Sequence, residues 1–463
     1  MAAPNISKQV LEEVRDELNS KSPSFCLAKW LQVTIHLQNG QTHSCHHPIS
    51  HKVQISDLQK SSSALHNTLN KKKNRKKMLK GARPSECDYC WKIEDAATEN
   101  LSDRVIKSAQ PWARPMMDHI KQLPWNASIN PTYVEVSFGN ECNFKCAYCS
   151  PSISSSIMNE LKTHGPYSVG GVSVEELKKN GLFPIEKDEF NPYVDSFWRW
   201  WPELNKDLQV FRITGGEPLL NENTFKFLDY IKNNPMPNLT IAVNSNLGVP
   251  KAIYRKFLNE VKYISENKLV KEFQLFTSVD TFGKNAEFIR FGLNYHDFIT
   301  NVHAFLDEVK DCELIFMCAY NAFSVINFKN FLEEVTVLKS KYLDNKGKTR
   351  VTLDIPYLKD PNYLSCYVLN KDFEHFMRRD LSYLQEHAFN SDGIEIFMNS
   401  EISKFERILT WFNSLEESKH RDNTRREFII FIREYQARKK IKYQDYVPEY
   451  QPFIEFCEQF EQS

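Results

Sequence analysis

The sequence predicts an α/β protein whose main part is a partial, open (β/α)6 barrel. Three observations lead to this fold class. Six short β-rich runs alternate with helix-like segments between residues 133 and 355. The runs are almost continuously apolar, which is typical of parallel strands covered by helices. Polar residues come directly after several runs, and active sites of barrels lie at the carboxyl ends of the strands.

The predicted strands are rich in β-branched and aromatic residues, and they span residues 133–138, 208–213, 239–244, 273–278, 313–318 and 351–355. Segments such as NENTFKFLDYIKNN and FKNFLEEVTVLKSKY follow strands and carry apolar residues at helical spacing. A closed barrel has eight such units. Because this sequence supplies six, we expect an open barrel in residues 125–360.

Two further segments flank the predicted barrel. In residues 1–110, WLQVTIHL and QTHSC predict two strands joined at Asn39–Gly40, a strong hairpin signal, so we expect a small α+β module. In residues 361–463, FERILTWFNSLEES and TRREFIIFIREYQARKK have apolar residues at three-to-four spacing, which predicts a C-terminal helical extension. The stretch DSFWRWWPEL has two interpretations, a lid over the barrel mouth or part of the core.

Composition excludes some classes of protein. Lysine plus arginine and aspartate plus glutamate each number 59, so no overall field draws the chain to nucleic acid or a membrane. No apolar run approaches the roughly 18 residues of a membrane span, and the first residues lack an apolar signal core. We expect a cytoplasmic protein. In such a reducing compartment, its 11 cysteines favour metal ligands or buried packing over disulfides.

Three cysteines gather in GNECNFKCAYCSP, directly after the first barrel strand. Cys142, Cys146 and Cys149 form a C-x3-C-x2-C array. A helical stripe of buried thiols would show similar offsets, but Gly139–Asn140 and Pro151 break the chain on either side and favour a loop. Zinc needs a fourth ligand, and iron–sulfur clusters normally take four thiolates. A cluster held by three cysteines would leave one iron open to a substrate or cofactor.

The stretch CNFKCAYC resembles the C-x3-C-x-aromatic-C signature of radical S-adenosylmethionine (SAM) enzymes, with Tyr148 at the aromatic position. FRITGGEPLL, VNSNLG and LFTSVDTFG resemble further elements of that superfamily, in the same order along the barrel. The resemblance implies a 4Fe-4S cluster on Cys142, Cys146 and Cys149 whose open iron chelates SAM. One electron, from a reductant such as flavodoxin or ferredoxin, then cleaves SAM to methionine and a 5'-deoxyadenosyl radical.

The same resemblance implies a set of SAM contacts. Gly215 and Gly216 leave room for close backbone approach to the ligand, and Glu217 accepts hydrogen bonds from its ammonium group. Polar side chains at later strand ends would bond the ribose, the carboxylate and other groups: Asn244, Asn246, Ser278, Asp280 and Arg290. For each of these residues the alternative is an ordinary turn or capping role.

A second group of cysteines lies in the N-terminal segment. Thirteen residues separate Cys26 from Gly40 and four separate Gly40 from Cys45, and PSECDYCW supplies Cys87 and Cys90. The arrangement resembles the twitch or SPASM module, here placed before the barrel as in N-terminal-twitch radical SAM proteins. It implies an auxiliary 4Fe-4S cluster on four cysteines. The alternative is zinc, because four histidines crowd Cys45: His43, His46, His47 and His51.

The resemblance gives the chemistry but not the substrate. A peptide or protein is favoured, because auxiliary clusters often serve such substrates, and the reaction is that of an oxidoreductase or a transferase. The basic run KKKNRKKMLK, residues 71–80, supports RNA or a nucleotide as the alternative. A non-catalytic, metal-stabilised binding protein is the other class that the pattern allows. The remaining cysteines are predicted to be buried packing: Cys312, Cys318, Cys366 and Cys457.

Overall fold

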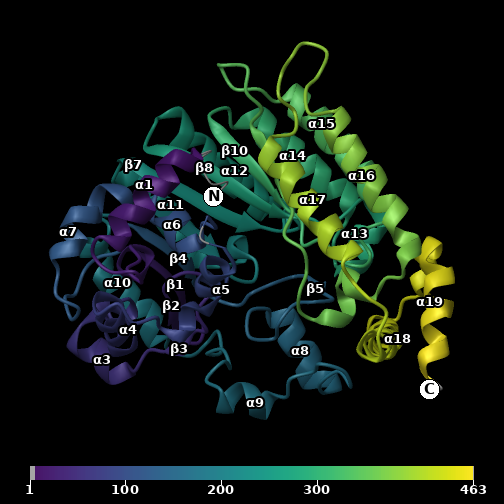
Figure 1. Cartoon of the computed structure of the whole chain (residues 1–463), viewed down its shortest axis with the longest axis horizontal. Coiled ribbons are helices and arrows are strands. Elements are labelled where there is room, and N and C mark those ends of the chain that lie inside the picture. The colour runs from purple at the N-terminus through teal and green to yellow at the C-terminus, as the bar shows by residue number, and fades with distance from the viewer. Residues whose placement is uncertain (1–5, 98, 462–463) are drawn as a thin grey trace. The chain divides into compact units, whose positions relative to one another are not determined.

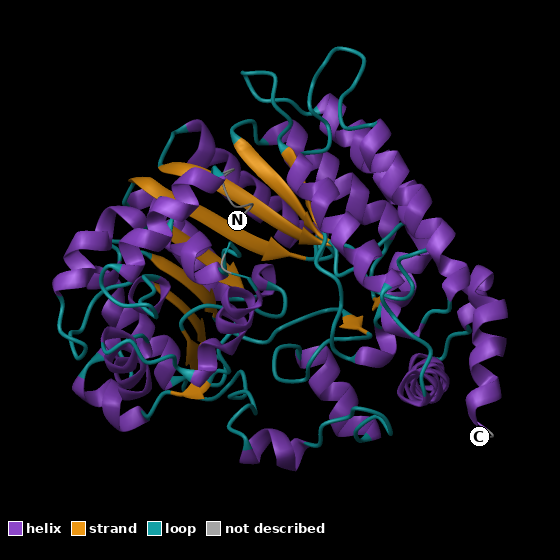
Figure 2. Cartoon of the chain, in the orientation of Figure 1, coloured by secondary structure: helices purple, strands orange, loops and turns teal. Residues whose placement is uncertain are grey.

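The protein is described by a computed structural model that covers residues 6–97 and 99–461. The chain divides into two compact units, each assembled from separate stretches. The first comprises residues 1–140, 178–218 and 236–242, and the second comprises residues 141–177, 219–235 and 243–463. The chain is built of both helices and strands (Figure 2), and both kinds of element occur in each unit, so the predicted α/β class is confirmed.

The sheet of the first unit has the strand order β6-β4-β1-β2-β3; Figure 1 labels β1 to β4. Its centre is parallel, with β4 (Tyr133–Ser137) between β1 (Gln32–His36) and β6 (Val210–Thr214). Two short strands, β2 (Gln41–His43) and β3 (His51–Lys52), continue it in antiparallel fashion. The first and second predicted barrel strands are therefore present, and the N-terminal hairpin extends the same sheet.

The hairpin between β1 and β2 forms where the sequence predicts it. Gly40 has a positive φ of 67°, and a Cβ there would lie 2.1 Å from the Tyr193 ring, so only glycine fits. The Asn39 side-chain oxygen accepts a hydrogen bond from the Gln41 amide at 3.2 Å, which stabilises the turn. The parallel pairing of β1 with β4 was not predicted.

Helices cover this sheet: α1 (Lys8–Asn19), α2 (Ala28–Leu31), α3 (Ile55–Lys60), α4 (Leu69–Leu79), α5 (Asp88–Ala96), α6 (Asp103–Ser108), α7 (Met117–Gln122) and α10 (Pro192–Leu204). The tryptophan-rich stretch forms α10. Trp200 and Trp201 are buried, and the Trp201 and Phe211 rings lie 5.3 Å apart. Within the first unit these side chains belong to the core, which favours the core interpretation over the lid.

The second unit has parallel strands in the order β8-β10-β11. These are β8 (Val270–Ser278), β10 (Cys312–Met317) and β11 (Val351–Asp354). The long strand β7 (Met236–Ser245) contributes its first part to the first unit and its last three residues to the second. A strand therefore forms at each of the six ranges that the sequence predicts.

The second unit also contains helices: α8 (Ser155–His164), α11 (Glu222–Asn233), α12 (Lys251–Glu266), α13 (Gly283–Ile289), α14 (Tyr295–Glu308), α15 (Phe328–Lys341), α16 (Glu374–Glu386), α17 (Asn399–Asn413), α18 (Lys419–Lys439) and α19 (Gln451–Glu458). The last four confirm that the C-terminal region is helical. Among the described residues, no helix combines the length and apolar character needed to cross a membrane.

A buried ion pair joins three elements of the second unit. The Lys339 ammonium on α15 donates to both carboxylate oxygens of Glu401 on α17, each at 2.7 Å, and to the Ile396 carbonyl at 2.8 Å. Glu401 also accepts from the amides of Leu353 on β11, at 2.6 Å, and Met398, at 2.8 Å. The three donors therefore make four hydrogen bonds to a single salt-bridged carboxylate that is withdrawn from water.

We expect Glu401→Gln to lower the free energy of unfolding by about 3 kcal/mol, because it leaves the Lys339 ammonium buried without a counter-charge. Urea titration measures the change. The matched control is Glu374→Gln, which breaks the exposed pair with Arg378 and should cost less than about 1 kcal/mol. Equal losses of unfolding free energy in the two variants would show that the buried pair stabilises the fold no more than the exposed pair does.

Candidate functional site

The three-cysteine segment is a loop, as predicted, and two elements of the second unit hold it. The two-residue strand β5 (Lys145–Cys146) pairs with β9 (Arg290–Phe291). At the start of α8, the Ser155 hydroxyl accepts from the Cys142 amide at 3.1 Å, and the Ser156 hydroxyl donates to the Cys142 carbonyl at 2.6 Å. The loop is thus fixed through its backbone, which leaves the thiols available as ligands.

The thiols of this loop influence one another. Burial raises the pKa of Cys146 to about 11, against the opposing effect of Arg290 and with a further contribution from Cys142. Burial also raises the pKa of Cys149, and the negative charges of Cys146 and Cys142 add to the effect. Thiolates at this depth need positive charge nearby, and metal ligation is one way to supply it.

A buried carboxylate fixes the aromatic residue of the loop. The Tyr148 hydroxyl donates to the two oxygens of Asp280 at 3.1 and 2.8 Å. Arg290 donates to the same oxygens at 2.9 and 3.0 Å, and the Ala319 amide donates at 3.1 Å. Asp280 is fully buried, and these donors match its charge and occupy both of its oxygens.

Arg290 connects this network to the cysteine loop, residues 142–149. Its Nη1 lies 3.9 Å from the Cys146 sulfur. Burial alone would lower the pKa of Arg290, but Asp280, Tyr148 and Cys146 outweigh it and raise the pKa. The guanidinium therefore stays charged between a carboxylate and a candidate ligand. The roles in SAM binding predicted for Asp280 and Arg290 stay predictions.

Two asparagines tie the end of β7 to the same loop. Asn246 donates to the Asn143 side-chain oxygen at 3.0 Å, and Asn143 donates to the Gly248 carbonyl at 2.8 Å. The Gly248 amide closes the ring by donating to Asn246 at 2.8 Å. A Cβ on Gly248 would lie 2.3 Å from the buried Phe144 ring, so this contact requires glycine. Sequence analysis missed Phe144, whose only signal is its place between two cysteines.

The other predicted SAM contacts have definite positions. Asn244 near the end of β7 and Ser278 at the end of β8 are half-buried. Gly215, Gly216 and Glu217 follow β6 in the first unit, where Glu217 is buried. Gly215 has a φ of 123°, and a Cβ there would lie 2.5 Å from the Ser137 hydroxyl oxygen. The structure thus joins Tyr148, Asp280, Arg290 and Cys146 in one network within the second unit. Gly215, Gly216 and Glu217 belong to the first unit.

A cavity of about 430 Å³ opens beside the cysteine loop within the second unit. Its walls are residues 145–151, α8, residues 165–172, residues 360–363 and α18. Aromatic rings line it: Phe431 lies 4.9 Å from Tyr167 and 5.0 Å from Tyr363, and Arg438 stacks 3.8 Å from the Tyr167 ring. The sequence did not predict this cavity, because its walls come from distant segments.

Glu160 balances the charges in this cavity. Tyr167 donates to it at 2.8 Å, Lys145 lies 3.7 Å away, and Lys439 contacts it directly. Although burial raises the pKa of Glu160, these partners outweigh it and lower the pKa below the usual range. The cavity therefore combines aromatic ring faces with paired charges.

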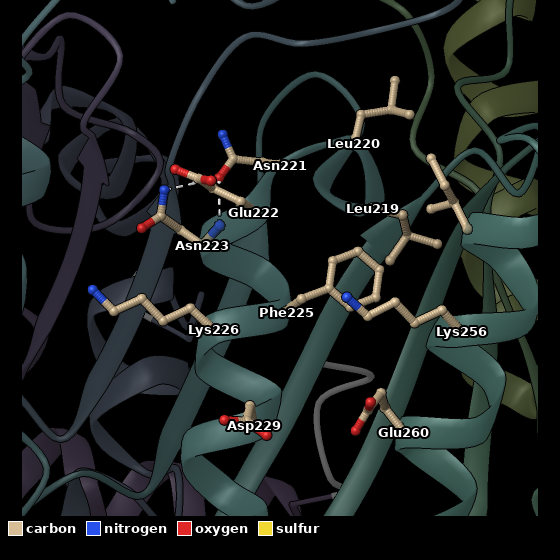
Figure 3. Close-up of a pocket in the computed structure, with 11 residues that line it drawn as sticks. Leu219, Leu220, Asn221, Glu222, Asn223, Phe225, Lys226, Asp229, Lys256 and Glu260 are labelled. Atoms are coloured by element: carbon tan, nitrogen blue, oxygen red, sulfur yellow. Dashed lines mark hydrogen bonds between the residues drawn. The ribbon is translucent and has the colours of Figure 1, made fainter.

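A larger groove of about 700 Å³ lies between α11 and α12 (Figure 3). It is lined by Leu219, Phe225 and Glu260, and the Lys256 ammonium lies 4.3 Å from the centre of the Phe225 ring. Neither a cysteine nor a predicted SAM contact lines it. We therefore take the smaller cavity as the candidate substrate site, because Cys146 and Cys149 line it.

The four N-terminal cysteines line one small cavity of about 20 Å³ in the first unit, and they share it with cationic and polar side chains: Lys29, Ser44, His47, Asp103, Arg104 and Lys107. Burial raises the pKa of Cys87 to about 12, against Lys29, and that of Cys90 to about 12, with a contribution from Cys26. The structure therefore brings together the cysteines that the sequence grouped.

Buried cations surround these thiols. Lys29 pairs with Glu86 and is almost fully buried, and Arg104 donates to Glu94 at 2.9 Å and to the Phe25 carbonyl at 3.0 Å. Burial lowers the pKa of Lys29, but Cys87, Glu86 and Cys45 together outweigh it and raise the pKa. The surroundings suit an anionic group on the thiols.

The basic run forms α4, and part of it points into the first unit. The buried Lys71 donates to the Thr42 hydroxyl at 3.1 Å. The buried Arg75 donates to the carbonyls of Lys29 and Ala127, each at 3.2 Å. Two of the cations proposed to contact RNA therefore have structural partners, which weakens the RNA interpretation.

The remaining cysteines are buried, as predicted: Cys312, Cys318, Cys366 and Cys457. The zinc alternative for the N-terminal thiols relied on nearby histidines. The Nε2 atoms of His43 and His36 lie 3.3 Å apart, and His51 Nε2 lies 2.8 Å from the Thr68 hydroxyl oxygen. Both histidines thus have partners other than the thiols.

Comparisons with known proteins give little beyond these observations. No family model matches the sequence, and no curated protein matches it. Among solved structures, the chain is similar to the crystal structure of Streptococcus suis SuiB bound to S-adenosylmethionine, at 13% identity and a TM-score of 0.34. The match covers 78% of this chain and 70% of SuiB. So distant a likeness assigns no function.

We expect Asp280→Asn to loosen the cysteine loop, because it leaves the buried Arg290 without a counter-charge and weakens its hold on Tyr148. Hydrogen–deuterium exchange should show faster exchange of amides in residues 142–149, by about tenfold or more for a loss of roughly 1.4 kcal/mol or more. The control Asp297→Asn removes an exposed carboxylate of α14 and should leave that exchange unchanged. Unaltered exchange in Asp280→Asn would contradict the anchoring role.

Proposed function

We propose that the chain is a radical SAM enzyme. The observation that carries the proposal is the C-x3-C-x-Tyr-C loop after β4, whose backbone is held by β9 and α8 and whose Tyr148 is fixed on Asp280 and Arg290. Polar elements also follow the neighbouring strands, at Gly215–Glu217, Asn244–Asn246 and Ser278–Asp280. Their order along the chain supports the same assignment.

The residues fit a 4Fe-4S cluster on Cys142, Cys146 and Cys149. Soft thiolates suit iron–sulfur clusters, and hydrogen bonding to a ligand sulfur, as from Arg290 to Cys146, is a recognised means of tuning them. When bound, the cluster supplies the electron that splits SAM into methionine and a 5'-deoxyadenosyl radical. Arg290 and Asp280 then serve first to orient the loop, because each already satisfies the other.

The remaining predicted contacts are proposed to hold SAM itself. Glu217 accepts hydrogen bonds from its ammonium group, and Gly215 and Gly216 allow close approach of the backbone. Ser278 bonds the ribose, with Asn244 and Asn246 supplying donors and acceptors nearby. Because Asn246 already donates a hydrogen bond to Asn143, it would orient the cysteine loop as well as contact SAM.

We propose a second 4Fe-4S cluster on Cys26, Cys45, Cys87 and Cys90. Its four thiolates would be matched by the buried cations around them, Lys29 foremost. The histidines that would favour zinc include His43 and His51, which have partners other than these thiols, and this supports the cluster.

The proposed substrate is a peptide or protein, bound in the cavity beside the cysteine loop. Its volume of about 430 Å³ lies in the range of ligand pockets, and its aromatic walls suit amino acid side chains. RNA is the second candidate, and the inward positions of Lys71 and Arg75 count against it. The reaction class, oxidoreductase or transferase, depends on the substrate. Flavodoxin or ferredoxin is the proposed reductant.

These tasks are assigned to three segments of the chain. Residues 1–110 form the auxiliary-cluster module, residues 125–360 the partial (β/α)6 barrel, and residues 361–463 the helical extension. The extension supplies α18, whose Phe431 and Arg438 line the proposed substrate cavity. In this proposal the first segment holds the auxiliary cluster, the second cleaves SAM, and the second and third together contact the substrate.

Anaerobically reconstituted protein should contain about eight irons per chain, as two four-iron clusters require. The triple variant Cys142→Ala, Cys146→Ala and Cys149→Ala should keep about four, because the N-terminal thiols are untouched. Under dithionite it should form no 5'-deoxyadenosine from SAM. The buried Cys457→Ala is the control and should retain both clusters and SAM cleavage.

Other outcomes of that experiment separate the alternatives. Colourless protein with stoichiometric zinc would contradict the radical SAM proposal. Two intact clusters without any 5'-deoxyadenosine would favour a non-catalytic binding protein. Loss of all iron in the triple variant would show that the two sites are not independent.

Substituting Cys87 and Cys90 together by alanine should remove the N-terminal cluster and make residues 1 to about 105 sensitive to protease, because ligation contributes to folding free energy. Limited proteolysis read by mass spectrometry locates the cuts. The variant should still cleave SAM slowly, since the barrel cysteines remain. A protease-resistant N-terminal segment with its cluster demonstrably absent would refute the structural role.

A further inference from the structure

Three ligand-type side chains lie together at the edge of the four-thiol cavity. His46 and His47 belong to the loop between β2 and β3, and Asp103 is the first residue of α6. Their ligand atoms all lie within 4.8 Å of one another. Sequence analysis grouped the two histidines with Cys45 but did not connect them with Asp103, which lies far along the chain.

The two imidazoles present the same ring atom to one carboxylate oxygen. His47 Nε2 lies 2.8 Å from Asp103 Oδ2, and His46 Nε2 lies 3.4 Å from the same oxygen. The His47 ring stacks on Tyr89, with centroids 3.9 Å apart and planes 15° apart, and only 15% of its side chain is exposed. Since Tyr89 lies between Cys87 and Cys90, the stacking holds His47 against the segment that carries these two cysteines.

We propose that His46, His47 and Asp103 bind one divalent transition-metal ion of the zinc class, at a site separate from the four thiols. Imidazole nitrogen and carboxylate oxygen suit such ions. Bonds of about 2.0–2.1 Å in tetrahedral geometry place donor atoms about 3.3 Å apart. The His46–Asp103 separation of 3.4 Å lies close to that value, and the His47–Asp103 separation of 2.8 Å would have to lengthen by about 0.5 Å on binding.

The ion has a mechanical consequence for the module. It would join the loop that carries Cys45 to the start of α6, at a distance in sequence of more than fifty residues. The site therefore clamps a cysteine-bearing loop through nitrogen and oxygen ligands, without using a thiol. Its existence does not depend on the identity of the group bound by the cysteines.

Lys107 is the charge that opposes the ion. Its ammonium lies 3.9 Å from Asp103 Oδ2 and 3.3 Å from His46 Nδ1. Because like charges repel at this range, Lys107 competes with a bound cation for the carboxylate. Removal of the Lys107 charge therefore strengthens metal binding, whereas an ordinary ion-pair network would bind no metal with or without it.

The test uses full-length protein reconstituted anaerobically, so that iron occupies the thiols, and dialysed against increasing zinc chloride. Zinc and iron per chain are measured together by mass spectrometry. We expect one zinc per chain with no loss of iron. His46→Ala and Asp103→Asn should each weaken zinc binding by more than about tenfold. Lys107→Met should tighten it by about threefold or more, and the exposed His119→Ala should leave it unchanged.

Iron content makes the outcomes separable. Iron at the wild-type level in each variant shows that the module remains folded, so a loss of zinc then reports on the ligands. Zinc uptake with a matching loss of iron would place the zinc on the thiols and overturn the proposal. Absence of zinc binding, or equal binding by His46→Ala, would overturn it as well. If the protein holds no iron–sulfur cluster at all, the proposed function fails, but zinc binding that depends on Asp103 still supports this site.

Discussion

The buried carboxylate of Asp280 is the group on which the cysteine loop of the second unit depends. It gathers Tyr148, Arg290 and the Ala319 amide at one point, and Arg290 extends the contact to Cys146. A carboxylate so far from water is tolerated because its charge is matched and its lone pairs are filled. The loop that offers the thiols is thus held by this ion pair in addition to its backbone contacts with β9 and α8.

The N-terminal thiols are organised in a different way. They come from separate positions in the first unit, and the cavity that they line also contains three cations, Lys29, Arg104 and Lys107. Lys29 and Arg104 each have a carboxylate partner, Glu86 and Glu94, which sets their positions before any group is bound. Carboxylates therefore hold the cations near the N-terminal thiols in place, whereas one buried carboxylate holds the loop of the second unit.

Local patterns in the sequence predicted local structure well. The six strand ranges, the hairpin at Gly40 and the C-terminal helices follow from short-range periodicity and turn chemistry. Contacts between distant segments were not predictable in this way. The pairing of β1 with β4 and the ring cluster of Tyr167, Tyr363 and Phe431 depend on which elements pack together, and single-sequence patterns do not contain that information. The mutual pairing of Asp280 and Arg290 was missed for the same reason, although each residue had been singled out.

The burial of Lys71 ties the charge of this side chain to the charge on the N-terminal thiols. Its ammonium is enclosed in the first unit with the Thr42 hydroxyl as hydrogen-bond acceptor, and burial, Arg75 and Lys29 all lower its pKa. Burial therefore favours the neutral amine of Lys71 over the charged ammonium. Negative charge on Cys45 acts in the opposite direction and raises the pKa. If the proposed cluster keeps Cys45 as a thiolate, cluster binding would also favour the charged form of Lys71, so a residue outside the ligand set would take up a proton as the cofactor assembles.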